Sequence, residues 1–178
     1  MIDDRLRWNR RYLEGRESAL HATLTRFYHL APYGRALDIA CGTGETSIYL
    51  AKKGFSVEAF DVSDVAIRKA RLKAKREGVS VKFKPLDADR FSFGVSRYNL
   101  ILNFYFLNRN TFPKIKRSLK SGGVLIFETY NEDHSSVNPS FNPSYLLRKG
   151  ELIEEFGDME ILYYCEVSNI TTLVARKP

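Results

Sequence analysis

The sequence predicts an α/β fold with a doubly wound, mostly parallel seven-stranded sheet and a C-terminal antiparallel hairpin. Apolar runs typical of strands alternate with helix-like segments four times between residues 35 and 130. Their short connections require right-handed helical crossovers, which make the strands parallel and put helices on both faces of the sheet. Two last apolar runs are separated only by Ser168 and Asn169, a connection that fits a hairpin turn and is too short for a crossover.

Residues 1–34 are predicted to form an N-terminal helical cap. A short helical stretch over residues 3–14 can end at Gly15. A second helix is predicted by apolar residues that recur on one face of a 3.6-residue period: Leu20, Leu24, Phe27 and Tyr28. Pro32 and Gly34 then break the helical pattern.

Residues 35–130 are predicted to form the core of the fold. Its five strands are the runs 36–40, 56–60, 79–84, 98–104 and 124–129. The connecting helices are predicted over 45–53, 63–77 and 111–120. Ser63 suits the N-cap of the second helix, and Gly122 with Gly123 is expected to turn into the fifth strand. The third strand alternates apolar with polar residues, as an edge strand with one wet face does.

The chain beyond the core departs from the alternation. Residues 131–148 are polar, contain prolines, and are predicted to form a loop over the carboxyl edge of the sheet, where open α/β sheets bind ligands. Residues 149–178 are assigned to the hairpin, whose strands are Met159–Val167 and Ile170–Ala175. The whole of 1–178 is thus expected to be a single domain.

The composition is that of an ordinary globular protein. The chain has 178 residues, 28 Lys and Arg against 21 Asp and Glu, and a net charge of +7. Cys41 and Cys165 are too few for a disulfide framework, and no Cys and His pair has zinc spacing, so no metal is expected. The N-terminus is charged throughout, unlike a signal peptide, and no apolar run approaches the ~20 residues of a membrane span. We expect a cytoplasmic protein without membrane contact, as a monomer or weak homodimer.

The basic balance raises the question of a nucleic-acid partner. The densest basic run lies on one predicted helix: Arg68, Lys69, Arg71, Lys73, Lys75 and Arg76. The apolar positions of this helix face inward, so a solvated helix face is the favoured interpretation. A nucleic-acid partner is kept as an alternative that is not favoured.

The stretch LDIACGTGE, residues 37–45, carries the chemistry. A strand ends in a glycine-rich turn that leads into a helix, so backbone amides and a helix N-terminus face an open crevice. Gly42 and Gly44 permit unusual dihedrals and the close approach of a ligand. Asp61 ends the second strand 19 residues after Gly42, where a carboxylate can accept hydrogen bonds from both hydroxyls of a ribose. The pattern predicts a nucleoside-containing ligand.

Two nucleoside ligands compete for this site. Gly42-x-Gly44-x-x-Ser47 is close to the dinucleotide fingerprint, which would imply NAD chemistry. Asp38, however, lies on the strand four residues before Gly42, and its negative charge would repel a pyrophosphate. The same charge suits an ammonium or sulfonium group, so the pattern favours S-adenosylmethionine.

The motif LDIACGTG resembles the first motif of class I S-adenosylmethionine-dependent methyltransferases, and the terminal hairpin is typical of that Rossmann-like methyltransferase fold. The run WNRRY at residues 8–12, the helical N-terminus and the small size are similar to the tellurite-resistance methyltransferase group and its thiopurine methyltransferase relatives. The resemblance makes 35–130 a cofactor-binding core and 131–148 an active-site loop. The class usually has glycine at the position of Ala40, where alanine is suited only to a negative φ.

The resemblance also implies which residues bind S-adenosylmethionine. Asp38 would hold the methionine ammonium with help from the Ala40 carbonyl, and Asp61 would bind the ribose diol. The glycine-rich turn would line the methionine part through Gly42, Thr43 and Gly44. Cys41 is counted with this turn as a packing residue and not as a nucleophile, since no histidine is near it in sequence.

The remaining cofactor contacts are expected around the adenine and the methyl group. Val62 would pack on the adenine face, and Asp87 with Ala88 would contact the edge of the ring. Asp89 is the alternative to Asp87. Asn103 ends the fourth strand beside the position of the transferable methyl, so it is assigned to the cofactor as well.

No catalytic residue is assigned, but four are kept as candidates: Tyr12, Asn103, Tyr105 and His134. The methyl acceptor is expected to contact aromatic and hydrogen-bonding side chains: Trp8, Arg11, Tyr12, Tyr105 and Tyr130. Of the three histidines, only His134 is expected to reach the active site, because His21 and His29 belong to the N-terminal helix.

The favoured function is in-line transfer of a methyl group from S-adenosylmethionine to a small-molecule acceptor, such as a thiol or a metalloid oxyanion. Alignment of the reacting atoms and exclusion of water are the main tasks of such an enzyme. Two alternatives stay open: a methyltransferase that acts on RNA or protein, and a nucleoside-binding module without catalysis.

Overall fold

The computed structural model describes residues 2–178, and side chains from residue 4 onward. Its centre is a seven-stranded sheet with the order β3-β2-β1-β4-β5-β7-β6. The strands are β1 Arg35–Ile39, β2 Ser56–Asp61, β3 Val81–Pro85, β4 Tyr98–Phe104, β5 Leu119–Tyr130, β6 Glu160–Val167 and β7 Ile170–Arg176. The first five strands pair in parallel, and β7 pairs antiparallel with β5 and β6. The predicted fold class and hairpin are confirmed, with β3 at an edge.

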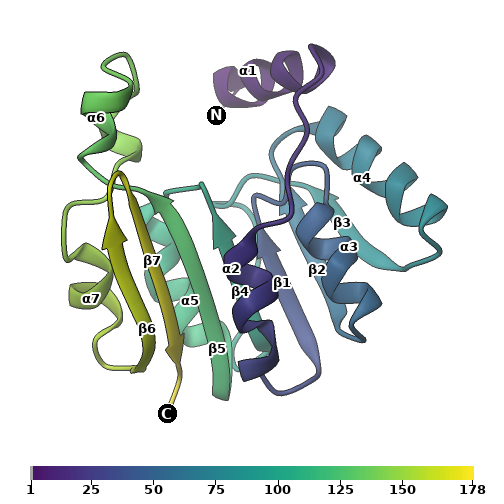
Figure 1. Ribbon diagram of the computed structural model, residues 1–178. Coiled ribbons are helices and arrows are strands. Elements are labelled where there is room, and N and C mark those ends of the chain that lie inside the picture. The colour runs from purple at the N-terminus through teal and green to yellow at the C-terminus, as the bar shows by residue number, and fades with distance from the viewer. Residues whose placement is uncertain (1) are drawn as a thin grey trace.

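Helices cover both faces of the sheet (Figure 1). They are α1 Ile2–Leu13, α2 Ala22–Phe27, α3 Glu45–Lys52, α4 Asp64–Arg76, α5 Phe112–Ser118, α6 His134–Val137 and α7 Glu151–Phe156, with the 3-10 turns η1 Tyr28–Leu30, η2 Arg109–Thr111 and η3 Pro143–Tyr145. Figure 1 shows α5 and α7 on one face, α2 and α3 on the other, and α1 and α6 beyond the carboxyl ends of the parallel strands. None of the described helices is long and apolar enough to cross a membrane.

Two apolar cores, one on each face, hold these layers together. On one face, Phe127 of β5 packs with Phe112 of α5 and Phe156 of α7. On the other, strand side chains pack with Leu24 of α2 and Leu50 of α3. Neighbouring strand residues alternate between the two cores because successive side chains of a strand point to opposite faces.

The start of β5 differs from the predicted turn. The register with β4 jumps from Tyr98 beside Leu119 to Leu100 beside Val124, so the chain bulges between two paired segments of one strand. Gly122 lies in this bulge with φ 75°. The glycine pair therefore marks an interruption of the strand and not its beginning.

Four other elements also differ from the sequence-based expectation. The segment assigned to the hairpin begins with α7, which was not predicted, and the predicted loop 131–148 contains α6 and η3. Leu20 precedes α2 and is 44% exposed, so the predicted apolar helix face is shorter than expected. By contrast, Ser63 caps α4 as predicted, since its hydroxyl accepts a hydrogen bond from the Ala66 amide at 3.1 Å.

Candidate active site

A cleft of about 1190 Å³ opens at the carboxyl ends of the parallel strands. Its walls come from α1 and the following segment on one side and from residues 129–145 on the other. Figure 1 shows α1 and α6 standing apart above the sheet, on the two sides of this opening. A ligand site at this edge is what the strand order predicts, because the chain reverses its winding direction between β1 and β4.

The glycine-rich turn after β1 is held by left-handed backbone and by the neighbouring strand. Ala40, Gly42 and Gly44 have φ values of 54°, 55° and 83°. The expectation of a negative φ at Ala40 is therefore wrong. Alanine in this conformation costs roughly 1–2 kcal/mol relative to glycine. Hydrogen bonds of the turn hold the backbone of Ala40 in this conformation. The Cys41 amide donates to the Phe60 carbonyl at 3.0 Å, and the Gly44 amide donates to the Cys41 carbonyl at 3.0 Å.

The N-terminal segment covers this turn. A β-carbon at position 42 would lie 2.0 Å from Ser18 Oγ and 2.7 Å from Tyr12 Oη, so the close approach that glycine permits is used by the chain itself. Thr43 is buried and hydrogen-bonds with Ser18. The cleft is lined by Ala40 and Cys41, whereas the three residues that follow them lie beneath its surface.

Asp38 forms a buried acidic floor of the cleft. Its carboxylate is 2% exposed, and its Oδ2 accepts a hydrogen bond from Ser47 Oγ at 2.6 Å. Burial raises the pKa of Asp38 to about 7, although the Ser47 hydrogen bond acts in the opposite direction. A cation placed beside this carboxylate would restore its charge, so the position suits an ammonium group.

Asp61 ends β2 and links two turns. Its Oδ2 accepts from the Gly42 amide at 2.9 Å, and its Oδ1 accepts from the Ser63 amide at 2.8 Å. Each oxygen keeps a second lone pair for a ligand hydroxyl. Burial raises the pKa of Asp61 while the two amides lower it. Val62, the next residue, also lines the cleft.

The segment after β3 brings more acidic groups to the same side. Asp87, Ala88 and Asp89 line the cleft. Asp87 Oδ1 accepts from the Asp89 amide at 2.9 Å, and Asp89 Oδ1 accepts from Asn108 Nδ2 at 3.1 Å. Asp87 therefore closes a local turn, which leaves its second oxygen for a donor in the cleft.

Asn103 lies below the cleft at the end of β4. Its Nδ2 donates to the Phe106 carbonyl at 2.7 Å, and the residue is fully buried. Its Oδ1 is buried without a hydrogen-bond partner among the described residues. An unpaired buried acceptor is costly, and a donor from a bound ligand would satisfy it.

Of the predicted acceptor residues, Trp8 and Arg11 lie together at the N-terminus, and two arginines that were not predicted lie beside the same indole. The guanidinium carbons of Arg11, Arg16 and Arg7 lie 5.1, 5.2 and 5.9 Å from the centre of the Trp8 ring. Tyr12 is 5% exposed, and burial raises its pKa to about 12. A phenol with so high a pKa is a poor proton acceptor at neutral pH, so Tyr12 is better suited to packing or hydrogen-bond donation.

The opposite wall carries the remaining predicted aromatics. Tyr105 and Tyr130 have ring centres 4.9 Å apart, and the His134 ring stacks on Tyr130 at 3.9 Å. His134 Nδ1 is 2.6 Å from Asn169 Nδ2. Tyr105 lines the cleft and has φ 51°, a strained value for a non-glycine residue.

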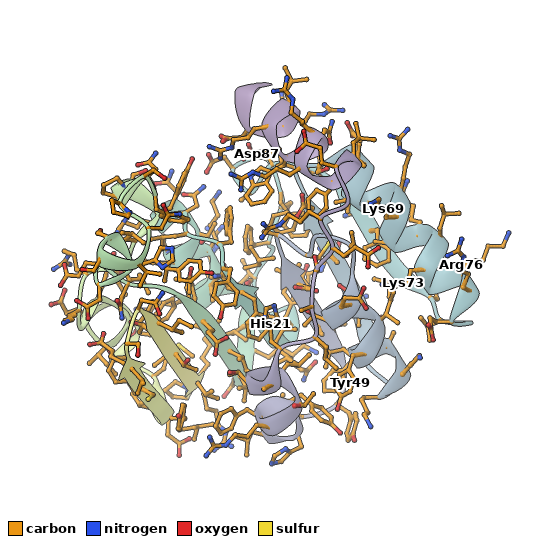
Figure 2. The ribbon with its side chains drawn as sticks, turned by 45° about the horizontal axis from the view of Figure 1, so that its top comes forward. His21, Tyr49, Lys69, Lys73, Arg76 and Asp87 are labelled. Atoms are coloured by element: carbon orange, nitrogen blue, oxygen red, sulfur yellow. The ribbon has the colours of Figure 1, made fainter. Side chains whose placement is uncertain are left out.

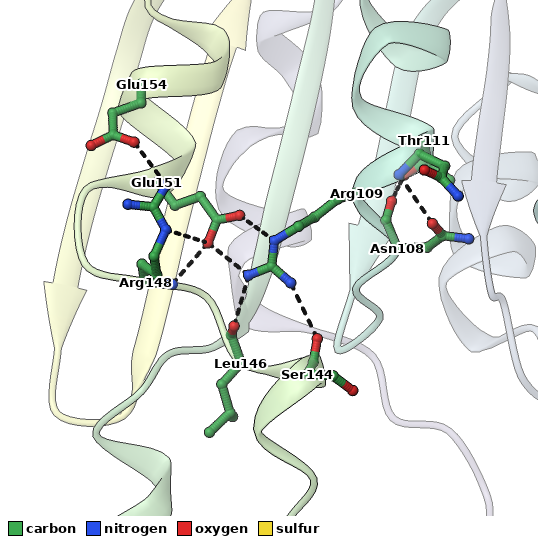
Figure 3. Close-up of polar contacts among 9 residues, drawn as sticks. Asn108, Arg109, Thr111, Ser144, Leu146, Arg148, Glu151 and Glu154 are labelled. Atoms are coloured by element: carbon green, nitrogen blue, oxygen red, sulfur yellow. Dashed lines mark hydrogen bonds and ion pairs between the residues drawn. The ribbon is translucent and has the colours of Figure 1, made fainter.

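Arg109 anchors the 144–151 segment beneath this wall (Figure 3). Its guanidinium pairs with the carboxylate of Glu151 and donates to the carbonyls of Leu146 and Ser144 at 3.0 and 3.2 Å. Glu151 also accepts from the Arg148 amide at 2.8 Å, and the Arg109 and Arg148 groups hold its pKa below the usual range against the effect of burial. The loop over the cleft is therefore tied to η2 at the sheet.

Two residues that the sequence did not point to bear on the site: one lines the cleft, and the other contacts a residue that lines it. His21 lines the cleft, which corrects the expectation that His134 is the only histidine to reach it. Glu128 of β5 is buried, hydrogen-bonds with Thr23, and accepts from Thr172 Oγ1 at 3.0 Å and Tyr105 Oη at 3.3 Å. The one sequence feature that could have pointed to Glu128 is its position as an acidic residue within the apolar run of the fifth strand.

The family assignment rests on the comparisons with known proteins. Residues 36–123 match the model of the methyltransferase domain family. A Geobacillus sp. (strain WCH70) protein named as a methyltransferase is 35% identical over 112 residues, 56% of this chain and 45% of that protein. TehB of Haemophilus influenzae, named as an S-adenosyl-L-methionine-dependent methyltransferase, is 26% identical over 157 residues, 84% of this chain and 54% of TehB. A TehB crystal structure from that species has a TM-score of 0.78 at 21% identity, covering 91% of this chain and 64% of that one.

Residues 36–123 thus form a methyltransferase domain, and the chain is similar to the S-adenosyl-L-methionine-dependent methyltransferase TehB. It spans about half the length of the curated relatives that it matches. S-adenosylmethionine is the cofactor of these methyltransferases, and the acceptor groups at the cleft fit it. Asp38 offers a carboxylate to a cation and Asp61 offers acceptors to hydroxyls, while Asn103 Oδ1, below the cleft, has no hydrogen-bond donor among the described residues.

Proposed function

We propose that this protein transfers the methyl group of S-adenosylmethionine to a small-molecule acceptor. The observation that carries the proposal is the division of the cleft into an acidic half at the ends of β1 to β3 and an aromatic half between α1 and residues 129–145. The first suits the cationic cofactor, and the second suits an acceptor that must be held away from water.

In this proposal, Asp38 binds the methionine ammonium, Asp61 the ribose hydroxyls and Asn103 Oδ1 a donor near the end of β4. When bound, S-adenosylmethionine supplies a methyl group on a sulfonium, whose thioether leaves as a neutral group. The chain orients the acceptor with the aromatic rings of Trp8 and Tyr105 and keeps the reacting atoms dry.

Positive charge on the acceptor side favours acceptors that carry or develop negative charge, such as thiols or metalloid oxyanions. Arg7 pairs with Asp4 at 2.7 Å, but Arg11 and Arg16 have no carboxylate within ion-pair distance among the side chains of residues 4–178. Both guanidiniums stand at the mouth of the cleft beside Trp8. A thiolate or an oxyanion would gain their attraction.

The basic residues of α4 give little support to a nucleic-acid substrate. Lys69 donates to the Tyr12 carbonyl, Arg71 donates to the Phe83 carbonyl, and Lys73 pairs with Glu45. Figure 2 shows Lys73 and Arg76 on the outer part of α4, well away from His21 and Asp87 at the cleft. Several basic side chains of α4 therefore make contacts within the protein, and the positive charge of this helix lies to the side of the cleft.

A methyl-donor assay tests the proposal. The protein is incubated with methyl-labelled S-adenosylmethionine and, separately, with thiols, selenite, tellurite, arsenite and total RNA. We expect label on a small thiol or metalloid product and none on RNA. Label on RNA alone, or on a protein acceptor in a lysate arm, would overturn the small-molecule assignment, and binding without any transfer would favour a non-catalytic module.

A further inference from the structure

His21 occupies a position between the two halves of the cleft. It is the N-cap residue of α2, immediately before Ala22, and its ring is half-buried. The ring stacks on Phe104 with centres 4.2 Å apart and lies 5.3 Å from Tyr105. Phe104 ends β4, and Tyr105 follows it. Both are close in sequence to Asn103, near which the methyl group is transferred in the proposed function.

The ring nitrogens of His21 have no hydrogen-bond partner among the described residues. His134, the other histidine of the cleft, contacts Asn169 through its Nδ1 and stacks on Tyr130. Within residues 4–178 the His21 side chain makes ring contacts and an electrostatic interaction with Glu128 but no hydrogen bond, so both of its nitrogens remain available to a molecule in the cleft. A half-buried imidazole with no internal partner is an uncommon use of a polar group, and such groups are frequent in active sites.

The charged and titratable groups that face His21 set its protonation. Glu128 comes from β5 and Tyr105 from the turn after β4. Burial lowers the pKa of His21 below its ordinary value of 6.5, and the Glu128 carboxylate opposes this only in part. The imidazole is therefore neutral at pH 7 and able to take up a proton.

Glu128 also fixes where His21 stands. It hydrogen-bonds with Thr23, two residues along the chain, and with Thr172 of β7. These bonds attach the first turn of α2 to the sheet. Glu128 thus acts as a positioning residue for His21. This role explains why a carboxylate lies within the otherwise apolar strand β5.

We propose that His21 is the general base of the methyl transfer and that the acceptor is a protic sulfur or oxygen nucleophile, a thiol or a hydroxyl compound. This rests on the proposed function and narrows it, because an oxyanion that attacks through a lone pair has no proton to give up. The acceptor's sulfur or oxygen forms a bond to the methyl carbon, and the methyl–sulfonium bond breaks with its electron pair on sulfur. The acceptor's proton passes to a free His21 nitrogen and from there to water.

Matched acceptors separate base catalysis from a structural role. The probes at pH 8 are 2-phenylethanethiol and 4-methylphenol, which are mostly protonated, and 4-nitrothiophenol and 4-nitrophenol, which are ionised. We expect His21→Gln to lower kcat/KM by about 100-fold or more for a protonated probe and by less than about threefold for its ionised counterpart. The thiol and phenol pairs show which nucleophile is used. His29→Gln, on the exposed η1 turn, is the matched control.

Two results would overturn the proposal: an equal loss for ionised and protonated probes, or selenite turnover that is the main activity and is unchanged in His21→Gln. A readout without turnover is the NMR titration of the His21 ring in the complex with S-adenosylhomocysteine. We expect a neutral ring at pH 7 and a pKa below the ordinary value of 6.5, and a protonated ring at pH 7 would contradict the assignment. Failure of S-adenosylhomocysteine to bind the wild type would count against the proposed function instead.

Discussion

Ser18 and Thr43 exchange two hydrogen bonds, although 25 residues separate them. The Ser18 amide donates to Thr43 Oγ1 at 2.8 Å, and the Thr43 amide donates to Ser18 Oγ at 3.0 Å. The contact joins the segment after α1 to the glycine-rich turn after β1. It explains why position 42 must be glycine in this chain, since a side chain there would displace Ser18.

Ser18→Ala is expected to lower the free energy of unfolding by about 1–2 kcal/mol, because the Thr43 amide loses its acceptor. Hydrogen exchange of the Thr43 amide should become faster in the same variant. Ser80→Ala, at an exposed serine, is the control for chemical denaturation. An unchanged Thr43 exchange rate would show that the contact does not hold the turn.

Asp38→Asn is expected to weaken binding of S-adenosylmethionine and to stabilise the empty protein at high pH. The pKa of Asp38 is raised to about 7 in the fold, from an ordinary value near 3.8. The folded state therefore holds this proton more tightly, so stability is lost as the pH rises from about 4 to about 7.

The pH dependence of stability and of cofactor affinity shows whether the Asp38 charge binds the cofactor or has only a structural role. Removing the carboxylate should raise stability by about 2–4 kcal/mol at pH 8 and by little below pH 4, which denaturant titration at the two pH values can measure. In the wild type, affinity for the cofactor should fall as the pH drops below about 7, because a protonated Asp38 no longer attracts an ammonium. A variant that binds the donor normally at every pH would make Asp38 a purely structural residue.

Asp61→Asn is expected to weaken S-adenosylhomocysteine binding by about 1–3 kcal/mol, since a carboxylate is a stronger acceptor of hydroxyl hydrogen bonds than an amide. Asparagine is the milder change because its single side-chain oxygen can still accept from one of the two amides, Gly42 or Ser63, that Asp61 holds. Alanine would leave both amides without a partner and lower stability. Asp158→Asn, at an exposed surface ion pair, is the control for calorimetry, and equal affinities in both variants would refute the ribose assignment.

The combined change of Arg11→Gln and Arg16→Gln is expected to weaken anion binding at the mouth of the cleft by about tenfold or more. Trp8 is the single tryptophan of the chain, so its fluorescence reports on this position directly. The probes are sodium selenite and thioglycolate, titrated at low ionic strength. Arg68→Gln, on the exposed face of α4, is the control, and identical quenching curves would exclude an anion site at Trp8.

The elements that the sequence predicted well have local causes. The strand Tyr98–Phe104 is nearly all apolar, as is typical of a strand covered on both faces, and the structure has it with the predicted bounds. Ser63 caps α4 through a bond to a residue three positions along. The glycine-rich turn and its acids follow from a short motif whose spacing is set by the crossover geometry.

The elements that were missed depend on contacts across the fold. The six-residue helix α7 has Gly150 at its N-cap, without a side-chain cap, and its Glu151 is paired with Arg109, 42 residues away. His21 was placed on a helix by its apolar neighbours, yet the ring reaches the cleft because α2 begins only after it. The positive φ of Ala40 arises from the turn as a whole, which outweighs the preference of one residue.

The central claim is that the cleft at the ends of β1 to β4 is a site for S-adenosylmethionine. Isothermal titration of the wild-type chain with S-adenosylhomocysteine, and in parallel with NAD⁺, tests it most directly. We expect S-adenosylhomocysteine to bind one molecule per chain with a Kd in the micromolar range or below, and NAD⁺ to give no saturable heat. Saturable binding of NAD⁺ with no heat from S-adenosylhomocysteine would contradict the account.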